Sequence, residues 1–208
     1  MIEFLKQLTD PQSIIEYGGL ALLLFVVFAE TGLLIGFFLP GDSLIFLSGM
    51  ICVSKPELLQ VSLPEIIGLL TLAAVLGNCA GYWFGYKVGP PLFKREDSFI
   101  FKKRYLEMTR SFYEKYGGAA LVFGRFLPII RTFAPILAGV IKINFKRFML
   151  FNIAGAVAWI GMLCCIGYYL GTYEWVQKNV GYIIIGLIVV TMIPLVITWL
   201  KTRKNPSV

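Results

Sequence analysis

Four long apolar runs constrain this chain more than any other feature of its sequence. They cover Leu20–Leu39, Ile66–Tyr86, Phe148–Leu170 and Tyr182–Leu200. Each run is close to the roughly 20 residues that a helix needs to cross the hydrocarbon core of a bilayer. A soluble protein of 208 residues would have to bury several such helices at once, and 58% of these residues are apolar. The pattern therefore predicts an all-α integral membrane protein.

The chain contains no histidine, and its four cysteines lie in or beside the apolar runs. Without histidine it lacks the usual general base near neutral pH and every Ser-His-Asp or Cys-His arrangement. The cysteines show no metal-binding spacing, so we interpret them as small packing residues. We therefore expect a protein that is not an enzyme and that holds no metal and no cofactor. Basic loops on one side of a membrane explain the net charge of +7 more simply than nucleic-acid binding does.

Three pairs of short motifs recur in the same order along the chain and indicate an internal duplication. The pairs are Gly36–Pro40 with Gly124–Pro128, Leu47–Ile51 with Leu137–Ile141, and Gly85–Gly89 with Gly167–Gly171. In each unit, a segment interrupted by proline and glycine precedes an uninterrupted apolar span. The duplication therefore predicts two units, each made of a broken segment and a transmembrane helix.

The broken segment of the first unit predicts a re-entrant helical hairpin, which enters and leaves the membrane on the same side. Pro40 and Gly41 set the geometry of its tip, and the following stretch, Leu44–Val53, is too short to cross as a helix. Such broken backbone is tolerated at membrane depth only where it is buried in protein or lines a cavity. A competing interpretation makes Leu20–Leu39 a simple spanning helix and moves the N-terminus to the opposite face.

The broken segment of the second unit also predicts a re-entrant hairpin. We expect Pro128 and Pro135 to bracket a loop that contains Arg131. Basic residues gather in 87–115 and in the tail at 201–204, which the positive-inside rule places in the cytoplasm. The two units are then inverted relative to each other. In transporters, inverted repeats of broken helices form a site near the membrane midplane.

These patterns divide the chain into five parts of a single membrane domain, 1–208. The parts are an N-terminal interfacial segment (1–17), repeat one (18–89), an amphipathic cytoplasmic connector (90–116), repeat two (117–171) and a C-terminal transmembrane helix (176–200). The first part lacks the pattern of a cleavable signal peptide. Aromatic residues recur near helical spacing among the cations of the connector, as in a helix lying at the membrane interface.

The hairpins carry four ionisable side chains: Glu30 and Asp42 in the first, Arg125 and Arg131 in the second. An ionised side chain at the bilayer centre costs about 2.5–3.5 kcal/mol on insertion scales, so we expect the hairpins to meet with acids facing arginines. In one interpretation these are structural ion pairs that hold the repeats together. In the other, the arginines bind an anionic substrate and the desolvated acids carry protons. Asp42 could also cap the helix that follows it.

Three motifs resemble those of the DedA family of bacterial membrane proteins, also called the SNARE-associated or VTT-domain family. They are Phe28-Ala29-Glu30-Thr31-Gly32, Phe38-Leu39-Pro40-Gly41-Asp42-Ser43, and Gly124-Arg125-Phe126-Leu127-Pro128-Ile129-Ile130-Arg131. The resemblance covers roughly Tyr17 to Gly171. It implies inverted re-entrant hairpins, dependence on the membrane proton gradient, and functional roles for the acidic pair and the arginine pair.

The resemblance also implies lipid transport, because bacterial members are linked to the return of undecaprenyl phosphate and eukaryotic relatives to phospholipid scrambling. We therefore expect a proton-linked flippase for undecaprenyl phosphate, multi-pass in the bacterial inner membrane with its C-terminus cytoplasmic. Arg125 and Arg131 would bind the lipid phosphate, and Glu30 and Asp42 would couple to protons. The alternatives are a proton-coupled antiporter of small cations or drugs, a phospholipid scramblase, and a membrane scaffold. The sequence leaves the oligomeric state open, a homo-oligomer included.

Overall fold

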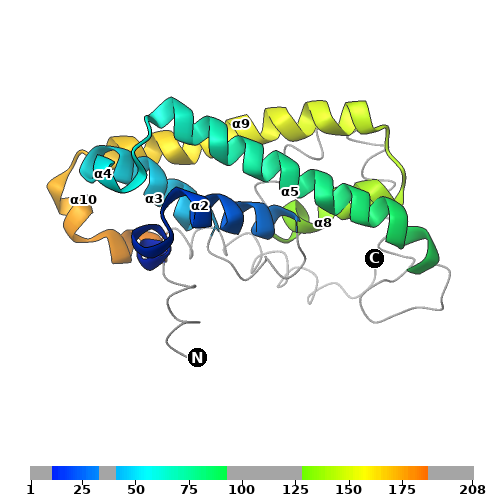
Figure 1. Cartoon of the computed structure of the whole chain (residues 1–208), viewed down its shortest axis with the longest axis horizontal. Coiled ribbons are helices and arrows are strands. Elements are labelled where there is room, and N and C mark those ends of the chain that lie inside the picture. The colour runs from blue at the N-terminus through cyan, green and yellow to red at the C-terminus, as the bar shows by residue number, and fades with distance from the viewer. Residues whose placement is uncertain (1–10, 33–40, 93–127, 187–208) are drawn as a thin grey trace, which may run out of the picture.

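The computed structural model describes residues 11–32, 41–92 and 128–186, and all of the regular secondary structure in these ranges is helical (Figure 1). This confirms the predicted all-α class. In chain order the elements are α2 (Pro11–Gly32), α3 (Gly41–Ser54), α4 (Pro56–Leu59), α5 (Leu63–Leu92), α8 (Pro128–Val140), α9 (Phe145–Leu170), α10 (Glu174–Lys178) and a helical stretch at 180–186.

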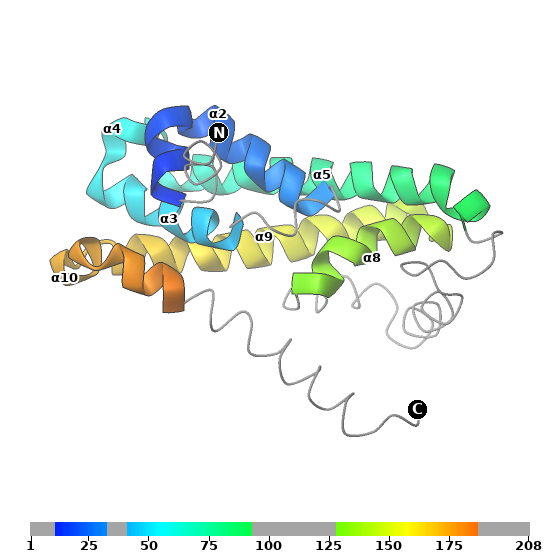
Figure 2. The ribbon, with the colours of Figure 1, turned by 90° about the horizontal axis from the view of Figure 1, so that it is seen from below.

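Two long helices, α5 and α9, form the frame of the molecule and run in opposite directions (Figures 1 and 2). Their segments Leu63–Val88 and Phe145–Leu170 are each long and apolar enough to cross a membrane, as predicted for Ile66–Tyr86 and Phe148–Leu170. Only 33% of the most apolar part of α9 is buried inside the protein. Large apolar side chains such as Leu150, which is 66% exposed, therefore face outward. This surface suits a lipid environment and is unlike the buried central helix of a soluble domain.

The helices of the first predicted hairpin are shorter. The apolar part of α2 is Gly18–Gly32, because the backbone bends at Gly19, where a φ of 53° favours glycine. The 14 residues of α3 span about 21 Å, well short of the roughly 30 Å of a hydrocarbon core. The two helices run in opposite directions, α2 beside α5 and α3 beside α9 (Figure 2). Pro40 and the rest of 33–40 lie outside the described residues, so the re-entrant hairpin stays a prediction.

The second predicted hairpin is described only from α8 onward, and here one expectation was wrong. Arg131 does not lie in a loop bracketed by prolines, because α8 begins at Pro128 and runs through Pro135 to Val140. Proline is well tolerated as the first residue of a helix, where its missing N–H would have no partner. Pro135 lies in the interior, and it has no N–H to donate to the carbonyl of Arg131 four residues earlier. The proline therefore weakens α8 beside the arginine without ending it.

Glycines allow α3 to pack backbone-to-backbone against α9. A Cβ atom added at Gly49 would lie 2.1 Å from the carbonyl oxygen of Cys164, and one added at Gly167 would lie 2.0 Å from that of Phe46. Real Cβ atoms essentially never come so close to another heavy atom. Only glycine is therefore compatible with this approach at either position.

The pair α5 and α8 repeats these contacts at the positions that the sequence repeat makes equivalent. Gly139 corresponds to Gly49, and its added Cβ atom would lie 2.0 Å from the carbonyl oxygen of Tyr82. Gly85 corresponds to Gly167, and its added Cβ atom would lie 1.9 Å from the carbonyl oxygen of Ile136. The short helix of each unit thus packs on the long helix of the other unit. These duplicated contacts support the predicted duplication, while its inversion across the membrane stays a prediction.

A buried polar contact joins the two long helices near their middle. Asn78 on α5 donates from Nδ2 to Oδ1 of Asn152 on α9 at 2.7 Å, and Asn152 donates in turn to the carbonyl oxygen of Val75 at 3.3 Å. Both asparagines are buried, so each has found a partner in place of water. The contact fixes the register of α5 against α9.

Gly167→Ala tests the close packing of α3 on α9. The new methyl group would meet the Phe46 carbonyl, so we expect a loss of about 1–3 kcal/mol of stability, as in other overpacked interiors. Gly161→Ala, on the same helix, is the matched control because a Cβ atom there meets nothing within 4 Å. Thermal unfolding in detergent should show a lower midpoint for the first variant and an unchanged or higher one for the second. Equal midpoints would contradict the close approach.

Candidate functional site

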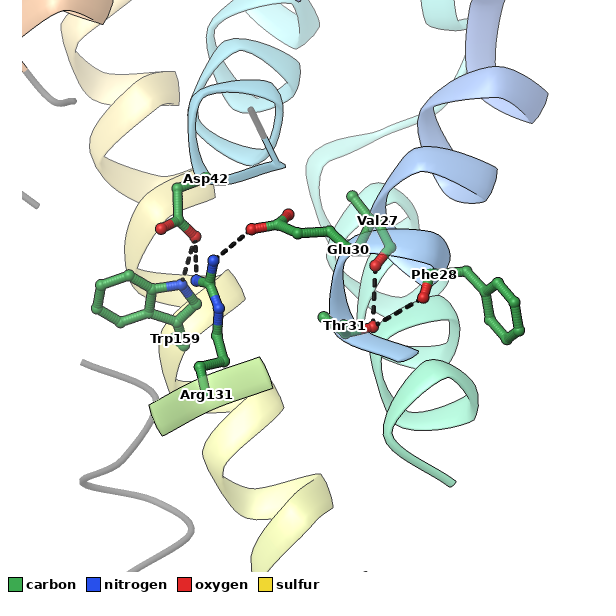
Figure 3. A network of polar contacts seen from close by, with 7 residues as sticks. All are labelled: Val27, Phe28, Glu30, Thr31, Asp42, Arg131 and Trp159. Atoms are coloured by element: carbon green, nitrogen blue, oxygen red, sulfur yellow. Dashed lines mark hydrogen bonds and ion pairs between the residues drawn. The ribbon is translucent and has the colours of Figure 1, made fainter. Parts of the chain in front are cut away.

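A single buried arginine joins a buried and a partly buried acid from two other helices (Figure 3). Arg131 on α8 donates from Nη1 to Oδ1 of Asp42 at 2.5 Å, and its Nη2 forms an ion pair with Oε1 of Glu30. The side chains of Arg131, Glu30 and Asp42 are 7%, 6% and 13% exposed. The prediction that acids of the first hairpin face an arginine of the second is confirmed for this residue. Both carboxylates contact the same guanidinium, and the expected contact with Arg125 falls outside the described residues.

Trp159 completes the cluster, and sequence reasoning missed it. Its indole Nε1 donates to Oδ1 of Asp42 at 3.0 Å, the same oxygen that accepts from Arg131 (Figure 3). A signal for this role exists in the sequence, because Trp159 lies in the middle of the apolar run Phe148–Leu170. Tryptophans in membrane proteins gather at the two interfaces, and a buried indole N–H usually has a hydrogen-bond partner.

The four residues come from four helices, and each is placed by local packing. Glu30 lies in the last turn of α2, whose end is pressed against α5: a Cβ atom at Gly32 would lie 2.6 Å from the carbonyl oxygen of Gly77. Asp42 lies in the first turn of α3, where the helix dipole favours a negative charge. The helix begins at Gly41, so Asp42 does not occupy the capping position considered for it. Trp159 projects from the centre of α9.

Glycine is needed at position 41 for a more specific reason than the tight turn predicted there. A Cβ atom added to Gly41 would lie 1.3 Å from Oε2 of Glu30, so the carboxylate occupies the space that any other residue would fill. The other oxygen of the same carboxylate is the one paired with Arg131. Glycine at this position therefore lets Glu30 reach the arginine.

Counting only residues that the structure describes, the cluster carries a net charge of −1 when both acids are ionised, since one guanidinium faces two carboxylates. Removing one member of a buried ion pair typically costs 3–5 kcal/mol, because the remaining charge stays desolvated. Among the described residues, the buried Nε of Arg131 has no hydrogen-bond partner. Buried polar atoms are rarely left so, which marks Nε as a donor available to a ligand.

The structure brings together three of the four predicted charged residues. Glu30, Asp42 and Arg131 meet, whereas Arg125 lies outside the described residues, as does Pro40. Gly41 adjoins the acid pair, and Pro128 and Pro135 belong to the helix that carries Arg131. Chemically, the arrangement can hold a proton on either carboxylate and can offer a guanidinium to an anion.

Comparison with known proteins places Asp42, Arg131 and Trp159 in a shared domain. The profile of the VTT domain matches residues 39–169. Protein DedA of Escherichia coli (strain K12) is 38% identical over 191 residues, which are 91% of this chain and 86% of that protein. Inner membrane protein YqjA of the same strain is 35% identical over 167 residues, 80% of this chain and 73% of that protein.

An uncharacterized membrane protein of Mycobacterium tuberculosis (strain ATCC 25618 / H37Rv) is 39% identical over 176 residues, 85% of this chain and 76% of that protein. No solved structure matches this chain. The names of the Mycobacterium tuberculosis relative and of YqjA identify membrane proteins, in agreement with the apolar surfaces of α5 and α9.

Gly41→Ala should act through Glu30, and a double-mutant cycle can show it. The added methyl group would displace the Glu30 carboxylate from Arg131, at a cost of about 1–3 kcal/mol. In a Glu30→Ala background the space is empty, so the same substitution should be nearly neutral. Thermal unfolding of the four proteins in detergent gives the coupling between the two sites. Equal costs in both backgrounds would show that Gly41 serves only the backbone.

Proposed function

The chain belongs to the VTT-domain family, the family of the DedA proteins, and on this premise we propose that it is a proton-linked membrane transporter of a lipid phosphate. Undecaprenyl phosphate is the substrate we expect. The observation that carries the proposal is the buried guanidinium of Arg131, shared by two carboxylates in a protein with a lipid-facing surface. Intramembrane ionisable residues most often mark substrate pathways and proton relays.

A phosphate would compete with the two acids for Arg131. The planar guanidinium fork matches phosphate oxygens as well as it matches carboxylates, and such charge-assisted hydrogen bonds are the strong ones. In the arrangement described, Nη1 and Nη2 are both taken by acids and Nε is without a partner among the described residues. The proposed substrate site therefore exists in an acid-bound state, in which a lipid phosphate has to displace at least one carboxylate.

Protonation of an acid would decide whether Arg131 binds the carboxylates or the phosphate. When one proton binds to Glu30 or Asp42, the cluster goes from −1 to neutral, and the protonated acid no longer attracts the guanidinium as an anion. The released N–H groups can then donate hydrogen bonds to the phosphate of the lipid. Proton uptake on one side of the membrane would thus favour substrate binding, and proton release would favour substrate release.

We further propose that the protein is multi-pass in the bacterial cytoplasmic membrane with its C-terminus in the cytoplasm. The end of the bundle where α5 ends and α9 begins carries Lys87, Lys142, Lys146 and Arg147, all exposed (Figure 1). The positive-inside rule assigns this end to the cytoplasm. The exchanged glycine contacts of α3 with α9 and of α8 with α5 support two inverted units around the cluster.

Two other transport functions give different expectations for the same cluster. A proton-coupled antiporter of small cations or drugs would use Glu30 and Asp42 as ligands, although Arg131 already neutralises one of their two charges. A phospholipid scramblase would move lipids without a pH gradient. A scaffold would need the cluster only for stability.

The decisive measurement is flipping of undecaprenyl phosphate in proteoliposomes at two pH values. Wild-type protein should flip the lipid at a rate that depends on pH. Arg131→Ala and Glu30→Gln should each lower the rate by roughly tenfold or more, the loss expected for one hydrogen bond to a charged group. A rate that neither variant changes would contradict the proposed mechanism.

A variant in which the cluster is uncharged is the control for stability. The triple variant Glu30→Gln, Asp42→Asn, Arg131→Gln removes all three charges that the structure describes in the cluster, so it should fold in detergent with a normal elution profile. We expect it to be inactive in flipping, whereas a scaffold would keep its function. Cation transport without lipid would favour the antiporter, flipping without pH dependence the scramblase, and phosphate release from the lipid an enzyme.

A further inference from the structure

A shallow groove lies on the surface of α5 beside the start of α9, away from the ion-pair cluster. It is lined by Cys79, Tyr82, Trp83, Tyr86 and Phe145 and has a volume of about 610 Å³. Its four residues on α5 are spaced three and four apart, so they form one stripe along that helix. We call this surface the aromatic groove. It is within the size range of small-molecule sites, which are about 300–1,000 Å³.

The floor of the groove is held by contacts between α5 and the start of α9. Tyr82 donates from its hydroxyl group to the carbonyl oxygen of Ile143 at 2.6 Å, which ties α5 to the turn before α9. Its ring packs against those of Phe148 and Phe145, with centroids 4.7 Å and 5.3 Å apart. Trp83, Phe145 and Tyr86 nevertheless remain 59%, 47% and 46% exposed. An ordered, exposed aromatic surface on a spanning helix is suited to contact with a lipid chain.

The rim of the groove is cationic. Lys87 Nζ lies 4.1 Å from the centroid of the Trp83 ring, and Lys142 Nζ lies 5.4 Å from that of Tyr86. Lys142 has a φ of 55°, a left-handed conformation that is uncommon for a residue other than glycine. The described segments around the groove, 79–92 and 139–152, contain no aspartate or glutamate. Both cations therefore lie over the groove without an acid nearby in these segments.

A second observation also indicates an anion at this end. The first turn of α9 contains Lys146 and Arg147 and no acidic residue. Cations are unfavourable at the start of a helix, where the dipole is positive, unless a negative charge lies beside them. Asn144 caps the turn by accepting from the backbone N–H groups of both residues. Their side chains are exposed and have no acidic partner within the described residues.

From these contacts we propose that the aromatic groove binds a membrane lipid with an anionic headgroup. The headgroup is held by Lys87 and Lys142 at the rim, with Lys146 and Arg147 adding to the positive field. The lipid chain lies along Trp83, Tyr86 and Phe145. Basic residues between or beside membrane helices attract anionic headgroups in this way. The site does not depend on transport, since it requires only that the protein reside in a bilayer.

Native mass spectrometry of the full chain in detergent tests the proposal with phosphatidylglycerol as the anionic probe and phosphatidylcholine as the zwitterionic one. We expect phosphatidylglycerol to be retained in preference. The double variant Lys87→Gln/Lys142→Gln should weaken retention by about 25-fold, because each cation near an anionic surface contributes a factor of roughly five. The matched control is Lys55→Gln/Lys178→Gln, two exposed lysines at the opposite end, which should leave retention unchanged.

Tryptophan fluorescence locates the lipid chain. Phosphatidylglycerol with brominated chains should quench the indole emission of the wild type, and Trp83→Phe should remove a part of that quenching. Trp175→Phe is the control, because Trp175 is 70% exposed but lies at the other end of the bundle. Equal retention of both lipids, equal effects of the two lysine pairs, or quenching that Trp83→Phe does not change would each overturn the proposal. A groove filled by another part of the chain would give the last of these results.

Discussion

The shared ion pair of Arg131 is the contact on which the rest of this architecture depends. One guanidinium draws together Glu30 from α2 and Asp42 from α3, and the second acid is also bound by Trp159 from α9. A membrane interior offers no water to solvate these charges, so the helices that carry them have to meet. The close glycine contacts are then needed, because four helices with ordinary side chains between them would keep the charged groups apart.

Much of this arrangement could be predicted because it follows from strong physical constraints on the sequences of membrane proteins. Helices that cross a bilayer need long apolar runs, and α5 and α9 coincide with two such runs. Charges inside an apolar segment need partners, which predicted that Glu30 and Asp42 would face Arg131. The motif pairs that indicated a duplication also identified Gly49, Gly139, Gly85 and Gly167, and all four make equivalent backbone contacts.

Other features could not be predicted, because they depend on distances between segments far apart in the chain. Trp159 resembles any aromatic residue of a spanning helix until Asp42 is brought within 3.0 Å of it. A sequence with two acids and two arginines suggests two pairs, and the sharing of Arg131 depends on where α8 lies against α2 and α3. Pro135 suggested a break, but a helix packed along α5 tolerates an interior proline, since its backbone is held by tertiary contacts.

The glycine contacts also sort the helices of the cluster into two groups. α3 packs directly on α9, while α8 packs on α5, which also contacts the end of α2 through Gly32 and Gly77. Glu30 and Arg131 therefore come from one group of helices, and Asp42 and Trp159 come from the other. The bond between Arg131 and Asp42 joins the two groups, as does the bond between Asn78 and Asn152, whereas the bond between Arg131 and Glu30 stays within one group. The two acids are thus unequal, because only Asp42 links the two groups through the arginine.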